Sequence, residues 1–162
     1  LKGLKLVFAG DGRNNVARSM MIGTSKMGID IVILAPKALW PEAELIEECK
    51  GYASASQSRI EITEDMAAVK GADVIYTDVW CSMGEEELMA ERINLLRPYQ
   101  VNDDMLKMTG KDSTVVMHDL PAVKGNEVTE EVFERFADVI FDEAENRMHT
   151  IKAVMVATLG NA

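Results

Sequence analysis

The stretch DIVILA, residues 30–35, decides the fold class, because five of its six residues are apolar and Pro36 ends it. The run is too short to show helical periodicity, and its β-branched residues favour a strand. A strand that is apolar at nearly every position is buried on both faces, as in a parallel sheet covered by helices on each side. We therefore expect an α/β domain with a doubly wound, mainly parallel sheet.

Similar apolar runs alternate with longer helical patterns along the chain. The predicted strands are residues 4–9, 30–35, 59–63, 72–77, 113–117 and 137–141. The predicted helices are residues 16–27, 42–51, 63–70, 85–96, 103–109, 129–136 and 142–159. Each helix is long enough for a crossover between parallel strands. In the last helix Met148, Ile151, Met155 and Leu159 follow the helical period and are expected in the core.

The organisation of the chain indicates one domain over residues 1–162. There is no internal repeat, low-complexity tract or linker in these 162 residues. The chain begins at Leu1 rather than Met, three residues before the first apolar run, so we expect a longer polypeptide upstream.

Charge and composition exclude several classes of function. The 17 Lys and Arg against 27 Asp and Glu give a net charge of −10, so neither nucleic acid nor an anionic membrane is an expected partner. No apolar stretch reaches the roughly 20 residues that a bilayer requires, and no signal segment opens the chain, which predicts a cytoplasmic protein. The chain has only two cysteines, Cys49 and Cys81, which lie in unlike sequence contexts, and only 2 His. We therefore expect no zinc site and no disulfide framework, and we expect no cofactor.

The first candidate loop is GDGRNN, residues 10–15, between the first strand and the first helix. In a doubly wound sheet, ligands bind beyond the carboxyl ends of the strands, where the strand order switches. The loop superficially resembles a dinucleotide fingerprint, but the third glycine is absent and no acidic residue ends the second strand. Nucleotide binding therefore stays a weak alternative. Asn14 or Asn15 either caps the helix, or the two adjacent side-chain amides donate hydrogen bonds to a carboxylate at the helix N-terminus.

The second candidate loop is DVWCSMG, residues 78–84, directly after a buried strand. Asp78 stands at the strand tip and Ser82 one turn further on. A carboxylate and a hydroxyl placed in this way are suited to hold an amine. Asp78 is equally compatible with a plain turn or cap.

Two further segments, residues 118–121 and 142–147, are expected at the same edge of the sheet. His118 follows a strand, where it is either a packed histidine or a catalytic one. Arg147 lies in the first turns of the last predicted helix, where it either binds a phosphate or carboxylate bidentately or pairs with Glu143.

Four motifs, in this order and at these strand ends, together carry a specific resemblance: GDGRNN at 10–15, DVWCSMGEE at 78–86, HDLPA at 118–122 and FDEAENRMHTIKAVMVATL at 141–159. They closely resemble the second half of ornithine carbamoyltransferase, its ornithine-binding domain, from residue 1 to about residue 160. The resemblance implies the Rossmann-like fold of that domain, without the N-terminal carbamoyl phosphate-binding domain. It also implies transfer of the carbamoyl group of carbamoyl phosphate to L-ornithine, giving L-citrulline and phosphate.

The resemblance implies a role for each matching residue on the ornithine side. Asn15, Ser82 and Met83 would hold the α-groups of ornithine. Asp78 would contact the amines and help to position the δ-amine.

Other matching residues would serve the carbamoyl side. Arg147 would reach carbamoyl phosphate, whereas His118 and Leu120 would help to bind the carbamoyl oxygen. The catalytic set implied in this way is Asp78, His118, Asp119 and Arg147.

The chain departs from the family pattern in three respects. The Ser-Thr-Arg-Thr-Arg loop that grips the phosphate is absent, so we expect little or no turnover from this chain alone. Asp119 replaces the cysteine of the usual HCLP motif, and with Asp78 it would favour the charged δ-ammonium over the nucleophilic amine. The segment formed by residues 121–128 is shorter than the corresponding segment of many family members.

Two hypotheses follow from the sequence. The chain is either the ornithine-binding half of an enzyme or a separate module that binds ornithine or a related diamine without catalysis. Family members are commonly trimers, whereas this chain is expected as a monomer or a dimer.

Overall fold

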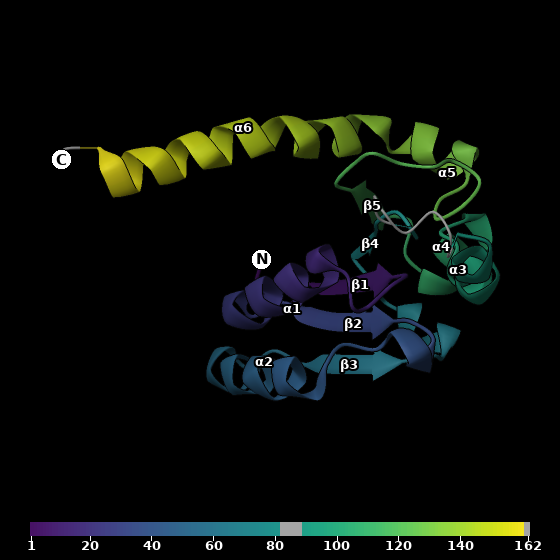
Figure 1. Ribbon diagram of the computed structural model, residues 1–162, viewed down its shortest axis with the longest axis horizontal. Helices are drawn as coiled ribbons and strands as arrows, with labels where there is room; N and C mark the ends of the chain where they lie inside the picture. The colour runs from purple at the N-terminus through teal and green to yellow at the C-terminus, as the bar shows by residue number, and fades with distance from the viewer. Residues whose placement is uncertain (82–88, 161–162) are drawn as a thin grey trace.

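The computed structural model describes residues 1–81 and 89–160, and it shows a five-stranded, all-parallel sheet with helices on both faces (Figure 1). The strand order is β3-β2-β1-β4-β5. The strands are β1 (Lys5–Ala9), β2 (Asp30–Leu34), β3 (Ile60–Thr63), β4 (Val74–Thr77) and β5 (Val115–His118). The expected doubly wound α/β sheet is confirmed.

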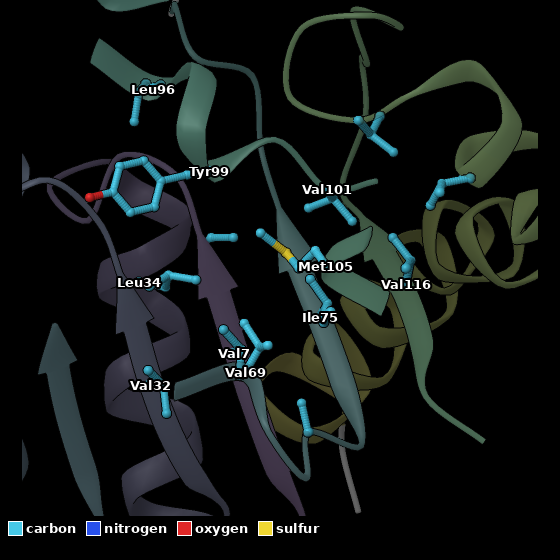
Figure 2. Packing of buried hydrophobic residues seen from close by; sticks show 14 of the residues in the cluster. Val7, Val32, Leu34, Val69, Ile75, Leu96, Tyr99, Val101, Met105 and Val116 are labelled. Atoms are coloured by element: carbon cyan, nitrogen blue, oxygen red, sulfur yellow. The ribbon is translucent and has the colours of Figure 1, made fainter. Parts of the chain in front are cut away.

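Alternate residues of the central strands supply two separate cores. In β1, Val7 and Ala9 belong to one buried cluster, whereas Leu6 and Phe8 belong to the other. Figure 2 shows part of the first cluster, in which Val7 of β1 and Ile75 of β4 lie among side chains from the covering segments. Burial on both faces explains why the run at 30–35 is almost continuously apolar.

The helices cover the two faces of the sheet (Figure 1). The α-helices are α1 (Asn15–Met27), α2 (Ala43–Ser56), α3 (Met89–Leu96), α4 (Asp103–Thr109), α5 (Glu130–Arg135) and α6 (Ala137–Leu159). Short 3₁₀ turns are η1 (Lys37–Leu39), η2 (Met66–Val69) and η4 (Arg97–Tyr99). Polar caps begin several helices; the Thr129 hydroxyl, for example, accepts the N–H of Val132 at 3.4 Å.

Two of the predicted elements are wrong. Residues 137–141, predicted as a sixth strand, form the first turns of α6. Residues 63–70, predicted as a helix, end β3 at Thr63 and continue as the short turn η2. The predicted helix at 85–96 is described only from Met89 onward, as α3.

Helix α6 begins beside β5 and then extends past α1, away from the sheet (Figure 1). From residue 144 to residue 160 every residue is exposed. The expectation that Met148, Ile151, Met155 and Leu159 are core residues is therefore wrong for this structure, in which they are 54–78% exposed. No helix in the described part of the chain has the length and apolar character needed to cross a membrane.

Candidate functional site

The strand order switches between β1 and β4, which is where ligands bind in sheets of this kind. The loops that follow these two strands are joined by a hydrogen bond of 2.9 Å from Asn14 Nδ2 to Asp78 Oδ2. One residue before Asp78, at the end of β4, the Thr77 hydroxyl donates to the carbonyl of Ala9, the last residue of β1, at 2.8 Å. The polar contacts thus hold the two loops together at the switch point.

The glycine-rich loop after β1 is stabilised by its own polar groups. Asn14 Oδ1 caps α1 by accepting the N–H of Ala17 at 2.7 Å. Asp11 accepts the N–H of Arg13 and forms a largely buried ion pair with Arg92. A Cβ atom on Gly12 would lie 2.7 Å from Ile33 Cγ2, so close packing on β2 explains this glycine without a phosphate.

Asn15, the residue expected to bind substrate, is the first residue of α1, and its side chain is exposed. The residue that contacts Asp78 is instead its neighbour Asn14. The signal for Asn14 was present in the sequence, because an Asn just before a helix is a preferred cap. The second contact of Asn14 is with Asp78, which is 64 positions away in the sequence, so it could be found only from the folded structure.

Asp78 and Asp119 form the acidic centre of the site. Asp78 is only 9% exposed, and potential ligand atoms of Asp78, His118 and Asp119 all lie within 4.8 Å of one another. The Asp78 carboxyl accepts hydrogen bonds from Asn14 Nδ2 at 2.9 Å and from the N–H of Val79 at 2.7 Å, and the Asp119 carboxyl lies beside it. Burial, followed by the charge of Asp119, raises the pKa of Asp78 to about 6.

His118 is fully buried at the end of β5, and both of its ring nitrogens face protein groups. Nδ1 accepts the N–H of Leu120 at 2.9 Å, and Nε2 lies 3.3 Å from Glu127 Oε1. In this arrangement the ring has no nitrogen left for a carbamoyl oxygen. Glu127, missed by sequence reasoning, lies in a loop and carries no motif that would single it out.

Asp78, His118 and Asp119 each offer one atom that could hold a metal ion. A metal-binding imidazole needs a free lone pair on the nitrogen that faces the metal. The Nδ1 lone pair of His118 already accepts the N–H of Leu120, and Nε2 faces Glu127. As arranged, these residues fit a shared proton or a bound ammonium better than a metal ion.

A cavity of about 930 Å³ opens beside the acidic centre, between the segment after β5 and α6. Asp119 and Leu120 reach it from one side and Arg147 from the other. Its lining residues are Asp119, Leu120, Pro121, Glu143, Ala144, Asn146, Arg147 and Thr150. Because α6 starts at Ala137, Arg147 stands near its middle rather than in its first turns as expected.

Glu143 links α6 to β4 beside this cavity. The Tyr76 hydroxyl donates to Glu143 Oε1 at 2.5 Å, and burial is the largest cause that raises the pKa of both groups. The charge of Asp119 raises the pKa of Glu143 further. Among the ion pairs of the described residues, none joins Glu143 to Arg147, so the predicted pairing of these two residues is not formed.

The structure thus brings together part of the predicted set. Asp78, His118 and Asp119 meet at the ends of β4 and β5, and Asp119, Leu120 and Arg147 line one cavity. Asn15 stands apart from that lining. Ser82 and Met83 lie outside the described residues.

Comparison with known families identifies the class of protein that this fold and site represent. Residues 2–158 match the family model of the aspartate/ornithine carbamoyltransferase Asp/Orn binding domain, and the chain belongs to this family.

Named relatives narrow the likeness to one kind of carbamoyltransferase. The ornithine carbamoyltransferase of Pseudothermotoga lettingae is 56% identical over 160 residues, covering 98% of this chain and 51% of the relative. The catabolic ornithine carbamoyltransferase of Bacillus licheniformis is 50% identical, covering 99% and 53%. The structure of ornithine carbamoyltransferase from Pyrococcus furiosus superposes with a TM-score of 0.92 at 44% identity, covering 99% and 51%. The chain therefore spans about half the length of the relatives it matches.

Proposed function

We propose that this chain is the ornithine-binding half of an ornithine carbamoyltransferase. In the proposed reaction the neutral δ-amine of L-ornithine attacks the carbonyl carbon of carbamoyl phosphate. A C–N bond forms, the bond to phosphate breaks, and the products are L-citrulline and phosphate. The names of the relatives support this substrate, and the acidic centre beside the cavity supports an amine ligand.

The single observation that carries the proposal is the juxtaposition of Asp78 and Asp119 beyond the carboxyl ends of β4 and β5. Within the described residues, no Lys or Arg forms an ion pair with either carboxyl. Two adjacent carboxyls without a protein cation are poorly compensated, and an ammonium group supplies the missing charge and hydrogen-bond donors. We assign Asp78 and Asp119 to the amines of ornithine.

The other assignments follow the family resemblance. Asn15, Ser82 and Met83 hold the α-carboxylate and α-amine of ornithine, and Leu120 borders the carbamoyl group. Arg147 binds carbamoyl phosphate, because it lines the cavity and its guanidinium is suited to bidentate contact with phosphate oxygens.

His118 needs a different assignment from the one that the resemblance implied. Its two ring nitrogens face Leu120 and Glu127, so direct contact with the carbamoyl oxygen would require one of these partners to be displaced. We assign His118 to holding the segment that carries Asp119 and Leu120.

We expect little or no turnover from this half alone. Positioning two substrates against each other supplies roughly 7–11 kcal/mol of the barrier reduction in well-oriented reactions. Carbamoyl phosphate therefore needs the other half of the protein as its binding partner. We also propose a cytoplasmic location and, for the assembled enzyme, the trimer common in the family.

Calorimetric titration tests the binding part of the proposal. L-Ornithine should bind to the isolated chain, whereas L-norvaline, which has the same carbon chain without the δ-amine, should bind at least tenfold more weakly. Absence of ornithine binding, or equal affinity for norvaline, would contradict the proposed role of the acidic centre.

A citrulline assay separates the enzyme from the alternative, a diamine-binding module without catalysis. The chain is mixed with a separately prepared carbamoyl phosphate-binding half of a relative. Turnover that requires both halves supports the proposal. Ornithine binding without any turnover in the mixture, together with turnover of the relative's own two halves, supports the binding module.

A further inference from the structure

Glu127 is a fully buried carboxylate that has no role in the proposed reaction. It lies between β5 and α5 with a relative exposure of 0%. Its Oε1 accepts the N–H of Val123 at 2.5 Å, and its own backbone carbonyl accepts the N–H of Val101 at 2.8 Å. Its Oε2 is buried and has no hydrogen-bond partner among the described residues. A carboxylate in such a position is costly unless a specific partner compensates for its burial.

That partner is the ring of His118, and the geometry defines its protonation. Because Nδ1 accepts the N–H of Leu120 at 2.9 Å, Nδ1 must carry a lone pair. The ring proton of the neutral imidazole is then on Nε2, which faces Glu127 Oε1 at 3.3 Å. A second ring proton, on Nδ1, would point at the Leu120 N–H. The nearest carboxylate oxygen of Asp119 is 3.6 Å from Nδ1, beyond hydrogen-bond distance.

The residue at the end of this chain of contacts has an unfavourable backbone conformation. Leu120 has φ = 61°, in the left-handed region that residues other than glycine rarely adopt. Together with Asp119, it lines the cavity of the proposed site. A strained backbone persists only where the surroundings hold it, and here the N–H of Leu120 is held by His118, which is in turn held by Glu127.

We propose that Glu127 is a positioning residue that keeps His118 in its Nε2–H tautomer and thereby holds the Asp119–Leu120 segment in its binding conformation. Glu127 touches neither substrate in this role; it acts through His118. The consequence for ligand binding rests on the proposed function, whereas the tautomer itself does not.

Long-range ¹H–¹⁵N NMR of the whole chain tests the proposal directly, since the chain has only His118 and His149. Wild-type His118 should show the Nε2–H tautomer at neutral pH, with exposed His149 as the internal reference. The Nδ1–H tautomer, or a doubly protonated ring, would overturn the proposal without any variant having to fold.

Two substitutions then separate positioning from packing. Glu127→Gln keeps an acceptor oxygen, so it should retain the tautomer and an ornithine affinity within threefold of wild type. Glu127→Leu fills similar volume without an acceptor, so it should change the tautomer population of His118 and weaken ornithine binding at least tenfold. Glu130→Leu, at an exposed site on α5, is the matched control and should change neither quantity.

The outcomes distinguish this proposal from the proposed function. A folded Glu127→Leu variant with an unchanged tautomer and unchanged affinity would refute the positioning role. A wild-type chain that shows the Nε2–H tautomer but binds no ornithine would refute the proposed function and the binding consequence, and leave the tautomer assignment standing.

Discussion

Asn14 uses its two side-chain atoms for two different parts of the fold: Oδ1 caps α1 through the N–H of Ala17, and Nδ2 donates to Asp78 Oδ2 at 2.9 Å. The start of α1 and the tip of β4 are thereby held by one amide. Because Asp78 is buried and beside Asp119, the donor that Asn14 supplies compensates part of its charge.

Replacing Asn14 should therefore cost stability through both atoms. Loss of a cap costs about 0.5–2 kcal/mol, and loss of a hydrogen bond to a charged group adds to it, so Asn14→Ala should lower the free energy of unfolding by about 2 kcal/mol. Asn15→Ala, one residue further along and exposed, should change it by less than about 0.5 kcal/mol. Urea unfolding at pH 7.5 measures both, and equal effects would refute the dual role of Asn14.

The variant Asn14→Asp isolates the second contact. Aspartate still accepts the N–H of Ala17, but it places another carboxylate against Asp78 in place of a donor. Asn14→Asp should be destabilised at pH 8 and should recover most of that loss at pH 5, where Asp78 holds a proton. A loss that does not depend on pH would show that the contact with Asp78 contributes little.

The raised pKa of Asp78 predicts how stability depends on pH. Burial and Asp119 raise it from 3.8 to about 6, so the folded chain holds this proton over a range in which the unfolded chain has lost it. The contribution of Asp78 to stability is therefore present at low pH and declines as the pH rises from about 4 to about 6. Asp78→Asn does not titrate, so its free energy of unfolding relative to wild type should rise by roughly 1.4 kcal/mol per pH unit across this window and level off about 3 kcal/mol higher.

This comparison cancels the other carboxyls. Asp73, whose pKa is lowered mainly by its hydrogen bond with Lys111, has the opposite pH dependence, but it contributes equally to wild type and variant. Urea unfolding at several pH values gives the difference curve. A curve that is flat between pH 4 and pH 7 would contradict the raised pKa.

The sequence predicted the sheet because its central strands are buried on both faces, which leaves an apolar pattern without periodicity. It failed where the same pattern occurs in another context. ADVIY at 72–76 leads into β4, whereas the nearly identical ADVIF at 137–141 opens α6. Residues 142–147, DEAENR, contain strong helix formers that continue from ADVIF, whereas Gly71 with φ = 75° precedes ADVIY. The propensities of these five residues alone cannot separate the two segments; the residues that flank them do.

The site was predictable where residues directly follow a strand, and Arg147, which lines the cavity, was found from its place in the last predicted helix. Asp78, His118 and Asp119 were found because parallel strands bring their carboxyl ends to one edge. Glu127 and the second contact of Asn14 were missed because both depend on pairs of segments whose approach no sequence motif records. The exposure of α6 was missed for another reason: periodic apolar residues predict a buried face, but not which molecule buries it.

Asp119 should strengthen ornithine binding through its charge. One additional carboxylate near an ammonium at partial burial corresponds to about a tenfold change in affinity. Asp119→Asn should therefore weaken ornithine binding about tenfold at pH 8 and leave norvaline binding unchanged. Calorimetry with both ligands is the measurement, and an equal loss for both would indicate that the substitution disturbs the site as a whole.

Asp119→Cys tests the cost of that charge for catalysis. A carboxylate stabilises the δ-ammonium more than the reacting neutral amine, which favours ground-state binding over turnover. In the complemented citrulline assay, Asp119→Cys should raise both the KM for ornithine and the turnover number. A lower turnover number would instead show that Asp119 assists the reaction, for example by accepting the proton from the δ-ammonium.

Helix α6 should cause the isolated chain to associate. Met148, Ile151 and Met155 are more than half exposed on a helix that extends beyond the sheet, and apolar surface of this kind favours burial against a partner. Sedimentation velocity should show a concentration-dependent dimer, and the combined substitutions Ile151→Glu and Met155→Glu should give a monomer with nearly unchanged unfolding. Lys152→Glu changes the net charge by the same amount, so it should still dimerise if apolar contact drives association. A monomer at all concentrations in wild type, or equal disruption by Lys152→Glu, would show that the apolar residues of α6 do not drive association of this chain.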